Sequence, residues 1–321
     1  MTEKKLLVFH QGALGDLVVA FPSIRNLRNR FSLIHGICRS SLGRLACRAG
    51  IFDRAFSIES AVFSTLFAYP FDSKLIDFLK PYDASIWFSF SKDLEAAVRK
   101  QTSGSVFRIS PRPEPSRRIH VAYHIEKNLL RLGLSDGLLL KKFDAAGRFV
   151  EKEAVQVKKS VLSRILLHIG SGSPRKNWPL DRFKAVYDQL RAMDLNPVFL
   201  LGPAERHRET DLKGWAYLIP QDLIVLHECL KNADAYIGND SGVTHLSAYL
   251  QLPTVAVFGP SDPLRWHPVG PIVRVVVSNA CNDFPCFETG KSHCEDCFEH
   301  ILPDSVVSAF LSLFPQDNLG L

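Results

Sequence analysis

The stretch Ala233–His245, with the sequence ADAYIGNDSGVTH, contains the transition that decides the fold. An apolar run ending at Ile237 leads into a turn rich in Gly, Asn, Asp and Ser, and then into a helical pattern that continues to Leu250. This order predicts a buried strand, a turn and a helix. The turn holds a carboxylate, a hydroxyl, a flexible backbone and an imidazole, in Asp240, Ser241, Gly242 and His245. It can cap the helix, or it can bind a phosphorylated, hydroxyl-rich ligand such as a sugar nucleotide.

Similar apolar runs recur within and on both sides of this stretch, and several of them are followed by a turn and a helical pattern. They are Leu6–His10, Leu33–Cys38, Ala55–Ile58, Ala84–Phe88, Val106–Ile109, Arg164–Ile169, Pro197–Leu201, Ala235–Gly238 and Thr254–Phe258. Alternation at this spacing predicts an α/β protein with parallel sheets. A charged, poorly periodic stretch, Phe143–Lys159, interrupts the alternation. We therefore expect two Rossmann-like domains, residues 1–155 and 156–321, that face a central cleft, with a last helix that could pack back on the first domain.

Charge is distributed unevenly over the 321 residues. The formal net charge is +6, but Lys and Arg outnumber Asp and Glu only in the first half of the chain. A basic half predicts either a solvated basic surface or an acidic partner, such as an anionic glycolipid. Nucleic acid is not expected, because no recognised binding motif or aromatic stacking platform accompanies the charge. Neither a spanning apolar run nor a signal peptide is evident, so we expect a cytoplasmic protein with, at most, peripheral contact at the inner membrane.

Two further loops carry residues suited to sugar-nucleotide chemistry. The loop Gly12–Asp16 follows the first strand but lacks the spacing of a dinucleotide or P-loop motif. Asp16 can cap the next helix or accept a proton from a substrate hydroxyl. The loop Gly170–Pro179 combines glycines and serines with Lys176, which predicts a site for a departing diphosphate. No Asp-x-Asp motif suggests a metal clamp, so cationic side chains and helix termini would stabilise the leaving group.

Four segments together resemble glycosyltransferase family 9, the heptosyltransferase family. They are a GxxGD loop at Gly12–Asp16, a Gly/Ser loop ending in Lys-x-Trp-Pro at Lys176–Pro179, a D-[ST]-G-x-x-H turn at Asp240–His245 and a G-P-[ST]-D-P segment at Gly259–Pro263. Their order and spacing are similar to those of the family from residue 6 to about residue 315. Four motifs in register are far more specific than any one of them.

The resemblance implies a GT-B fold and an inverting, metal-independent sugar transfer that needs no cofactor, usually from ADP-heptose to the inner core of lipopolysaccharide. The family's catalytic aspartate falls on Asp16, its donor-phosphate lysine on Lys176 and its donor-sugar aspartate on Asp240. The expected donor contacts are Ser171, Gly172, Ser173, Lys176, Glu205, Asp240, Ser241, Gly242 and His245. Acceptor contacts are expected in the basic half, at Gly15, Arg25 and Arg28.

The cysteines leave a further question open. Cys281, Cys286, Cys294 and Cys297 follow a C-x4-C-x7-C-x2-C spacing, which fits structural zinc, an iron–sulfur cluster, reduced thiols or disulfides. The alternatives to a heptosyltransferase are a noncatalytic binder of sugar nucleotides or glycolipids, a transferase of another hexose from a different donor, and a redox protein built on the cysteine loop.

Overall fold

The chain folds into two compact units. The computed structural model describes residues 3–67, 70–150, 162–278, 285–286 and 295–314. One unit comprises Met1–Glu114 and Val121–Gly147, and the other comprises Pro115–His120 and Arg148–Leu321. The division after Gly147 lies a few residues before the boundary expected after residue 155. The short segment Pro115–His120 groups with the second unit although the sequence places it in the first half.

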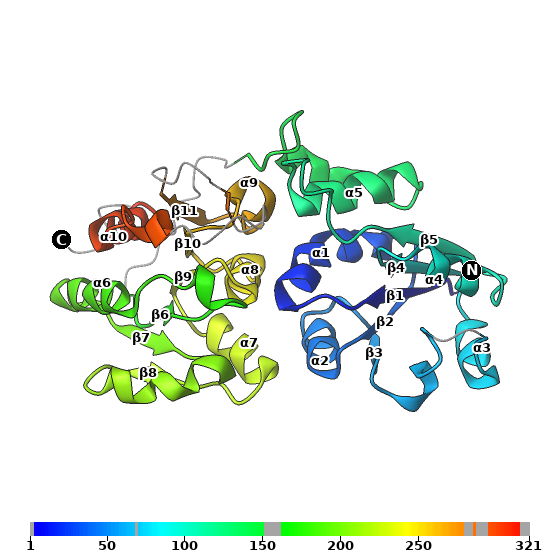
Figure 1. The fold of residues 1–321 in the computed structure, drawn as a ribbon, viewed down its shortest axis with the longest axis horizontal. Coiled ribbons are helices and arrows are strands. Elements are labelled where there is room, and N and C mark those ends of the chain that lie inside the picture. The colour runs from blue at the N-terminus through cyan, green and yellow to red at the C-terminus, as the bar shows by residue number, and fades with distance from the viewer. Residues whose placement is uncertain (1–2, 68–69, 151–161, 279–284, 287–294, 315–321) are drawn as a thin grey trace. The chain divides into compact units, whose positions relative to one another are not determined.

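The first unit is built on a five-stranded parallel sheet (Figure 1). Its strands are β1 (Lys5–His10), β2 (Leu33–Cys38), β3 (Arg54–Ser57), β4 (Ala84–Phe88) and β5 (Ser105–Ile109). The spatial order is β3-β2-β1-β4-β5, and every neighbouring pair is parallel. The order reverses between β1 and β4, which makes the gap between these strands the topological switch point of the sheet.

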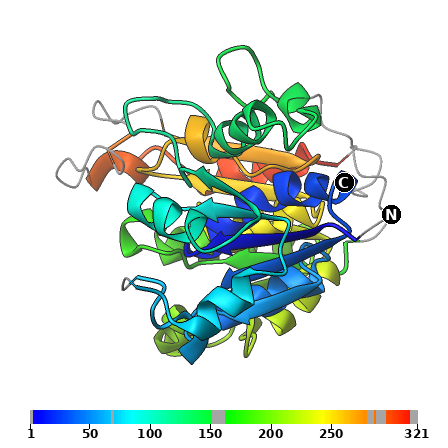
Figure 2. The ribbon, with the colours of Figure 1, turned by 90° about the vertical axis from the view of Figure 1, so that its right-hand side faces the viewer.

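Helices cover both faces of this sheet. They are α1 (Leu14–Asn26), α2 (Ser40–Arg48), α3 (Ser73–Leu79), α4 (Lys92–Arg99) and α5 (Val121–Arg131). Figures 1 and 2 show α1 and α5 on one face and α3 on the other. On the α3 face, Leu7 and Phe9 of β1 pack against Trp87 of β4 and against Leu75 and Leu79 of α3. The alternating side chains of a buried strand therefore supply both layers of the core.

The second unit contains a six-stranded parallel sheet. Its strands are β6 (Ile165–His168), β7 (Pro197–Leu200), β8 (Tyr217–Leu218), β9 (Ala235–Asn239), β10 (Thr254–Phe258) and β11 (Val273–Val277). Their order is β11-β10-β9-β6-β7-β8, and each adjacent pair is parallel. Counted from β6, this is the 3-2-1-4-5-6 order of the Rossmann fold, with its switch point between β6 and β9. The expected α/β class with two parallel sheets is confirmed.

The helices of the second unit are α6 (Leu180–Ala192), α7 (Leu223–Lys231), α8 (Gly242–Tyr249), α9 (Pro263–Trp266) and α10 (Pro303–Leu311). The helix α10 packs on α6, β10 and β11, all within the second unit (Figure 1). Phe310 of α10 and Phe183 of α6 are both fully buried in this core. Within the described part of the chain, no helix is long and apolar enough to cross a membrane.

Strand register explains why loops that are distant in sequence come together. In the second sheet, His168 of β6 pairs with Gly238 of β9 and with Leu200 of β7, and Asn239 pairs with Val257 of β10. These strands are parallel and end at the same level, so the loops that follow them share one edge. In the first sheet, Phe88 pairs with His10 and Ile109, which brings the loops after β1, β4 and β5 to one edge in the same way.

Candidate active site

Asp16 lies in the first turn of α1 and is held by the loop that precedes the helix. Its Oδ2 accepts a hydrogen bond from the backbone N–H of Ala13, the N-cap of α1, at 3.1 Å, so Asp16 does take part in capping the helix. The Gly12 N–H in turn donates to Nδ1 of His10 at 3.2 Å. A Cβ on Gly12 would lie 2.6 Å from Cβ of Asp16 and 2.7 Å from the ring of His10. The loop therefore needs glycine here, because the Asp16 and His10 side chains occupy the space.

The main partner of Asp16 is Arg112, a residue that the sequence places only in a Pro- and Arg-rich loop. Its Nε and Nη2 donate to Oδ1 and Oδ2 of Asp16, both at 2.9 Å. Asp16 is 8% exposed, whereas the side chain of Arg112 is 48% exposed. The two residues are 96 positions apart and meet because β1 and β5 end at the same edge of the sheet. A two-point contact with a guanidinium fixes the orientation of the carboxylate.

The residues expected at the acceptor site lie on α1 or in the 3-10 turn Leu27–Asn29 that follows it. Gly15 is half-buried in the first turn, next to Asp16. Arg25 is exposed in the last turn, and with a rise of about 1.5 Å per residue it lies roughly 13 Å along the helix from Asp16. Arg28 is already paired with Asp53, at 3.2 Å to each carboxylate oxygen. The structure therefore brings Gly15 next to Asp16 but does not bring Arg25 and Arg28 there.

An ion pair joins two of the expected donor-binding residues at the switch point of the second sheet. Nζ of Lys176 donates to Oδ2 of Asp240 at 3.1 Å, and the two side chains are 17% and 6% exposed. Nε2 of His245 lies 3.9 Å from Oδ1 of the same carboxylate. Ser241 is the N-cap of α8, with its Oγ accepting from the Thr244 N–H at 3.3 Å. Charge, hydroxyl and helix start are thus assembled within one turn, next to Gly242.

The Gly/Ser loop after β6 is held mainly by its own contacts and by Asn239. Oγ of Ser171 lies 2.6 Å from both the Ser173 carbonyl and Oδ1 of Asn177. The fully buried Asn239 donates from Nδ2 to the Ile169 carbonyl and accepts the Trp178 N–H at Oδ1, both at 2.9 Å. Asn239 was not expected at the site, although it directly precedes Asp240 and ends β9. Its amide fixes both ends of the phosphate-binding candidate loop.

Glu205 lies against two glycines at the carboxyl ends of β6 and β7. Its Oε2 accepts the Gly202 N–H at 2.9 Å, and the residue is 7% exposed. A Cβ on Gly170 would lie 2.2 Å from Cδ of Glu205, so only glycine leaves room for the carboxylate. Gly172 has open space around its Cα and is exposed. Glu205 therefore shares the edge of Lys176 and Asp240, with one oxygen already used to hold the β7 loop.

Burial keeps two histidines near these loops, His10 and His168, neutral. Burial lowers the pKa of His168, at the end of β6, to about 4, and Nδ1 of this residue has no hydrogen-bond partner among the described residues. Burial also lowers the pKa of His10 to about 4, although the charge of Asp16 opposes the shift. Because His10 accepts the Gly12 N–H at Nδ1, its proton must lie on Nε2. These rings act as fixed neutral parts of the two edges at physiological pH.

The cysteine-rich segment is described only in part. Cys281 and Cys294 lie outside the described residues. Cys286 and Cys297 are 1% and 3% exposed, with their Sγ atoms 3.3 Å apart. Among the side chains that the structure describes, no group of three or more His, Cys, Asp or Glu could hold a metal ion. The choice between metal, thiols and disulfide therefore stays open.

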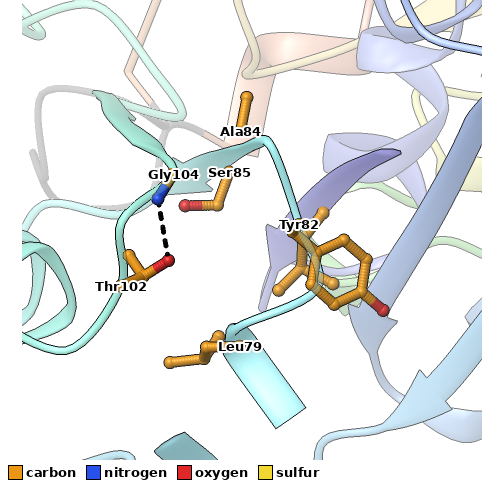
Figure 3. Close-up of a pocket in the computed structure, with 7 residues that line it drawn as sticks. Leu79, Tyr82, Ala84, Ser85, Thr102 and Gly104 are labelled. Carbon is orange, nitrogen blue, oxygen red and sulfur yellow. Dashed lines mark hydrogen bonds between the residues drawn. The ribbon is translucent and has the colours of Figure 1, made fainter. Parts of the chain in front are cut away.

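A small hollow in the first unit does not belong to these sites. It is lined by Leu7, Leu79, Tyr82, Ala84, Ser85, Thr102 and Gly104 (Figure 3). Ala84 begins β4 and Gly104 precedes β5, so the hollow lies at the amino ends of the strands, opposite the Asp16 edge. It has no room for even one water molecule. Ligand chemistry is therefore expected at the carboxyl edges and not here.

Solved structures share this fold over nearly the whole chain. The glycosyl transferase family 9 protein from Veillonella parvula DSM 2008 is 18% identical, with a TM-score of 0.72 over 98% of each chain. E. coli ADP-heptose lps heptosyltransferase II is also 18% identical, with a TM-score of 0.68 over 96% of this chain and 98% of that one. The iron-containing dodecameric glycosyltransferase TibC from enterotoxigenic E. coli H10407 is 14% identical, with a TM-score of 0.60 over 98% of this chain and 77% of that one. The expected GT-B fold is thereby confirmed.

Sequence comparison gives the family. No curated protein sequence matches the chain. The model of glycosyltransferase family 9 (heptosyltransferase) matches residues 131–295, which is half of the chain. The matched range includes the Gly/Ser loop, Glu205, the turn at Asp240–His245 and the segment Gly259–Pro263, so the motifs that suggested the resemblance in the second half all lie inside it. The chain therefore belongs to glycosyltransferase family 9, the heptosyltransferase family.

Proposed function

We propose that the protein transfers heptose from ADP-heptose to the inner core of lipopolysaccharide, with inversion at the anomeric carbon and without a metal in the transfer step. One observation carries the proposal: a candidate base and a candidate cation lie at the switch points of two Rossmann-like sheets, Asp16 in the first unit and Lys176 in the second. Ligands of open α/β sheets bind at such points. The donor is proposed because a structural neighbour is an ADP-heptose lps heptosyltransferase.

Asp16 would act as the general base. A carboxylate oxygen takes the proton of the acceptor hydroxyl while the hydroxyl oxygen attacks the anomeric carbon from the side opposite the diphosphate. One displacement through an oxocarbenium-like state gives inversion. The hydrogen bond from the Ala13 N–H fixes the orientation of the carboxylate, which a base acting in a single step requires.

Lys176 would stabilise the leaving diphosphate. As the bond from the anomeric carbon to the phosphate oxygen breaks, negative charge grows on the nucleoside diphosphate. The ammonium of Lys176 and the positive end of α8, which begins at Gly242, are groups that stabilise such charge. Ser171, Gly172 and Ser173 would line the diphosphate from the loop after β6.

The sugar and the nucleoside would be held by the remaining donor residues. Asp240 is suited to accept hydrogen bonds from sugar hydroxyls, because Lys176 and His245 lie beside its carboxylate and keep it oriented. Glu205 has one carboxylate oxygen on Gly202, and the other is suited to ribose hydroxyls. Ser241 would contribute its backbone at the start of α8.

The proposed setting is cytoplasmic, with peripheral contact at the inner face of the membrane. The basic first half of the chain supports attraction to an anionic glycolipid. Such contact is expected to weaken as salt rises, because exposed charges are screened over about 8 Å at physiological ionic strength.

A transfer assay with two variants and matched controls tests the proposal. Asp16→Asn and Lys176→Met are assayed with ADP-heptose and a deacylated inner-core oligosaccharide, and the exposed Asp93→Asn and Lys213→Met serve as controls. We expect both site variants to lose at least about a hundredfold in rate, the usual size for a lost catalytic group. Full activity in both would overturn the assignment.

Two additions to the same assay test its finer parts. Substituting UDP- and GDP-sugars for ADP-heptose tests the donor, and a higher rate with one of them would replace the proposed nucleotide. Dialysis against a chelator tests metal independence: we expect an unchanged rate, whereas a loss that a divalent cation restores would contradict it.

A further inference from the structure

Asp16 carries more contacts than a free base would. Oδ2 accepts from both the Ala13 N–H and Nη2 of Arg112, and Oδ1 accepts from Nε of Arg112. A carboxylate oxygen has two lone pairs in the carboxylate plane, so Oδ2 is saturated, and Oδ1 also lies 2.7 Å from Nη2 of Arg112. The guanidinium also neutralises the charge that would draw a proton from the acceptor. In this arrangement the proposed base is restrained.

The two partners differ in how firmly they are held. Asp16 is 8% exposed and also accepts the Ala13 N–H, a contact within its own helix start that does not involve Arg112. The side chain of Arg112 is 48% exposed and belongs to the loop between β5 and α5. That loop is anchored by its backbone, since the Ser110 carbonyl lies 3.0 Å from Nε2 of His124 and Oγ of Ser110 donates to the Arg112 carbonyl at 2.7 Å. The guanidinium can therefore change partner while both backbones remain in place.

We infer that Arg112 is an acceptor-operated switch, which holds Asp16 inactive until an acidic group of the acceptor takes the guanidinium. This inference rests on the proposed function, because it assumes that Asp16 is the base. A planar carboxylate or a phosphate can replace Asp16 on the guanidinium, because it offers the same paired oxygens. Neither a neutral hydroxyl nor water can do so.

The exchange has two consequences for the reaction. Without an acceptor, Asp16 stays paired, so water is poorly activated and the donor is protected from hydrolysis. With an acidic acceptor, Arg112 binds the substrate and frees Asp16 in the same event. The acidic group of the acceptor must lie close to the accepting hydroxyl. The guanidinium moves from Asp16 to that acidic group while the hydroxyl approaches the Asp16 carboxylate. Arg112 is thus a positioning residue that determines acceptor specificity.

The test compares hydrolysis with transfer in Arg112→Gln. Hydrolysis of ADP-heptose is measured without acceptor, and transfer is measured to the deacylated inner-core oligosaccharide and to the same oligosaccharide with its carboxylates reduced to alcohols. We expect Arg112→Gln to raise acceptor-free hydrolysis about five- to tenfold, the size expected when a half-exposed ion pair is released. Transfer to the acidic acceptor should fall at least about tenfold, and the preference over the reduced acceptor should disappear.

A rise in hydrolysis together with a fall in transfer distinguishes the switch from a structural role of Arg112. A merely structural Arg112 would lower hydrolysis and transfer together, and equal losses would overturn the inference. Arg112→Lys keeps the charge without the two-point geometry and should show the same signs at smaller size, which provides a second reading if Arg112→Gln unfolds. Arg131→Gln, exposed at the end of α5, is the control and should change neither rate. Asp16→Asn should abolish both, and if it does not, the proposed function itself fails.

Discussion

The ion pair between Lys176 and Asp240 gives the sharpest prediction, because the two residues share a structural contact but are proposed to act differently on the donor. At the observed 3.1 Å, two unit charges attract by about 5 kcal/mol at an effective dielectric constant near 20. Desolvation of both groups and the residual exposure of Lys176 offset part of that. We expect Lys176→Met to lower the free energy of unfolding by about 2 kcal/mol, because the buried Asp240 carboxylate then loses its paired cation.

The loss of stability caused by Lys176→Met should largely disappear when both charges are removed. For a unit of this size, about 2 kcal/mol corresponds to a fall in melting temperature of roughly 4–8 °C. The double variant Lys176→Met/Asp240→Asn should recover most of this, giving a coupling energy of about 1–2 kcal/mol in a double-mutant cycle. Activity should not recover, because the diphosphate still lacks its cation. Loss of one donor to a developing oxyanion typically costs about a hundredfold or more in rate.

The assay can follow the second unit by itself. Three of the four tryptophans, Trp178, Trp215 and Trp266, belong to that unit, so tryptophan fluorescence during thermal unfolding mainly reports on it. Lys213→Met is the matched control and should change neither stability nor rate. Additive destabilisation in the double variant would refute the ion-pair reasoning, and recovery of full activity would refute the proposed role of Lys176.

Three other measurements follow from the structure. Gly170→Ala should displace the Glu205 carboxylate, because the new Cβ would lie 2.2 Å from its Cδ. Steady-state kinetics should show a KM for the donor raised about tenfold with little change in kcat. A lowered kcat at constant KM would count against this prediction. His168 has a pKa of about 4 in the folded protein, against an ordinary 6.5, so the unfolded chain binds the proton first as pH falls. The free energy of unfolding should therefore fall as pH drops from 6.5 towards 4, by up to about 1.4 kcal/mol per pH unit. Urea unfolding at pH 7.5 and 5 should show a smaller fall for His168→Gln and an unchanged one for the exposed control His207→Gln; equal falls in both would contradict this. If the cysteine-rich segment binds zinc or iron, elemental analysis should find about one metal per chain, and its removal should lower the melting temperature more than the transfer rate; a colourless, metal-free protein of full stability would exclude that reading.

Most of the sheet architecture could be predicted from the sequence, because buried parallel strands are short, continuous apolar runs. Ala84–Phe88 and Thr254–Phe258 have the bounds that the sequence predicted. The helices α3 and α4 were not predicted, since with seven and eight residues each spans only about two turns, too short for a helical pattern to repeat. The start of α4 is nevertheless visible in hindsight: Ser91 caps it by accepting the Leu94 N–H at 3.1 Å. The edge strand β11 was also missed, because it follows a Pro-rich stretch and is only half-buried.

The contacts between distant residues could not be predicted in the same way. Asp16 and Lys176 were found through motifs, whereas Arg112 and Asn239 emerged only from the strand register that brings their loops to an edge. A single arginine in a Pro-rich loop has no sequence signal that names its partner. The sequence around an asparagine at a strand end does not indicate its partners either, because the backbone groups that it bonds belong to the neighbouring strand's loop.

The turn at Asp240 shows why capping and ligand binding are compatible. Oγ of Ser241 accepts the Thr244 N–H and so satisfies one of the unpaired amides at the start of α8. Asp240, one residue earlier, takes no part in the cap and pairs instead with Lys176. The cap fixes where the helix begins, and this in turn fixes where its positive end and the Asp240 carboxylate lie. A helix that began one residue later would carry both away from the Gly/Ser loop, so the capping residue positions the proposed donor site.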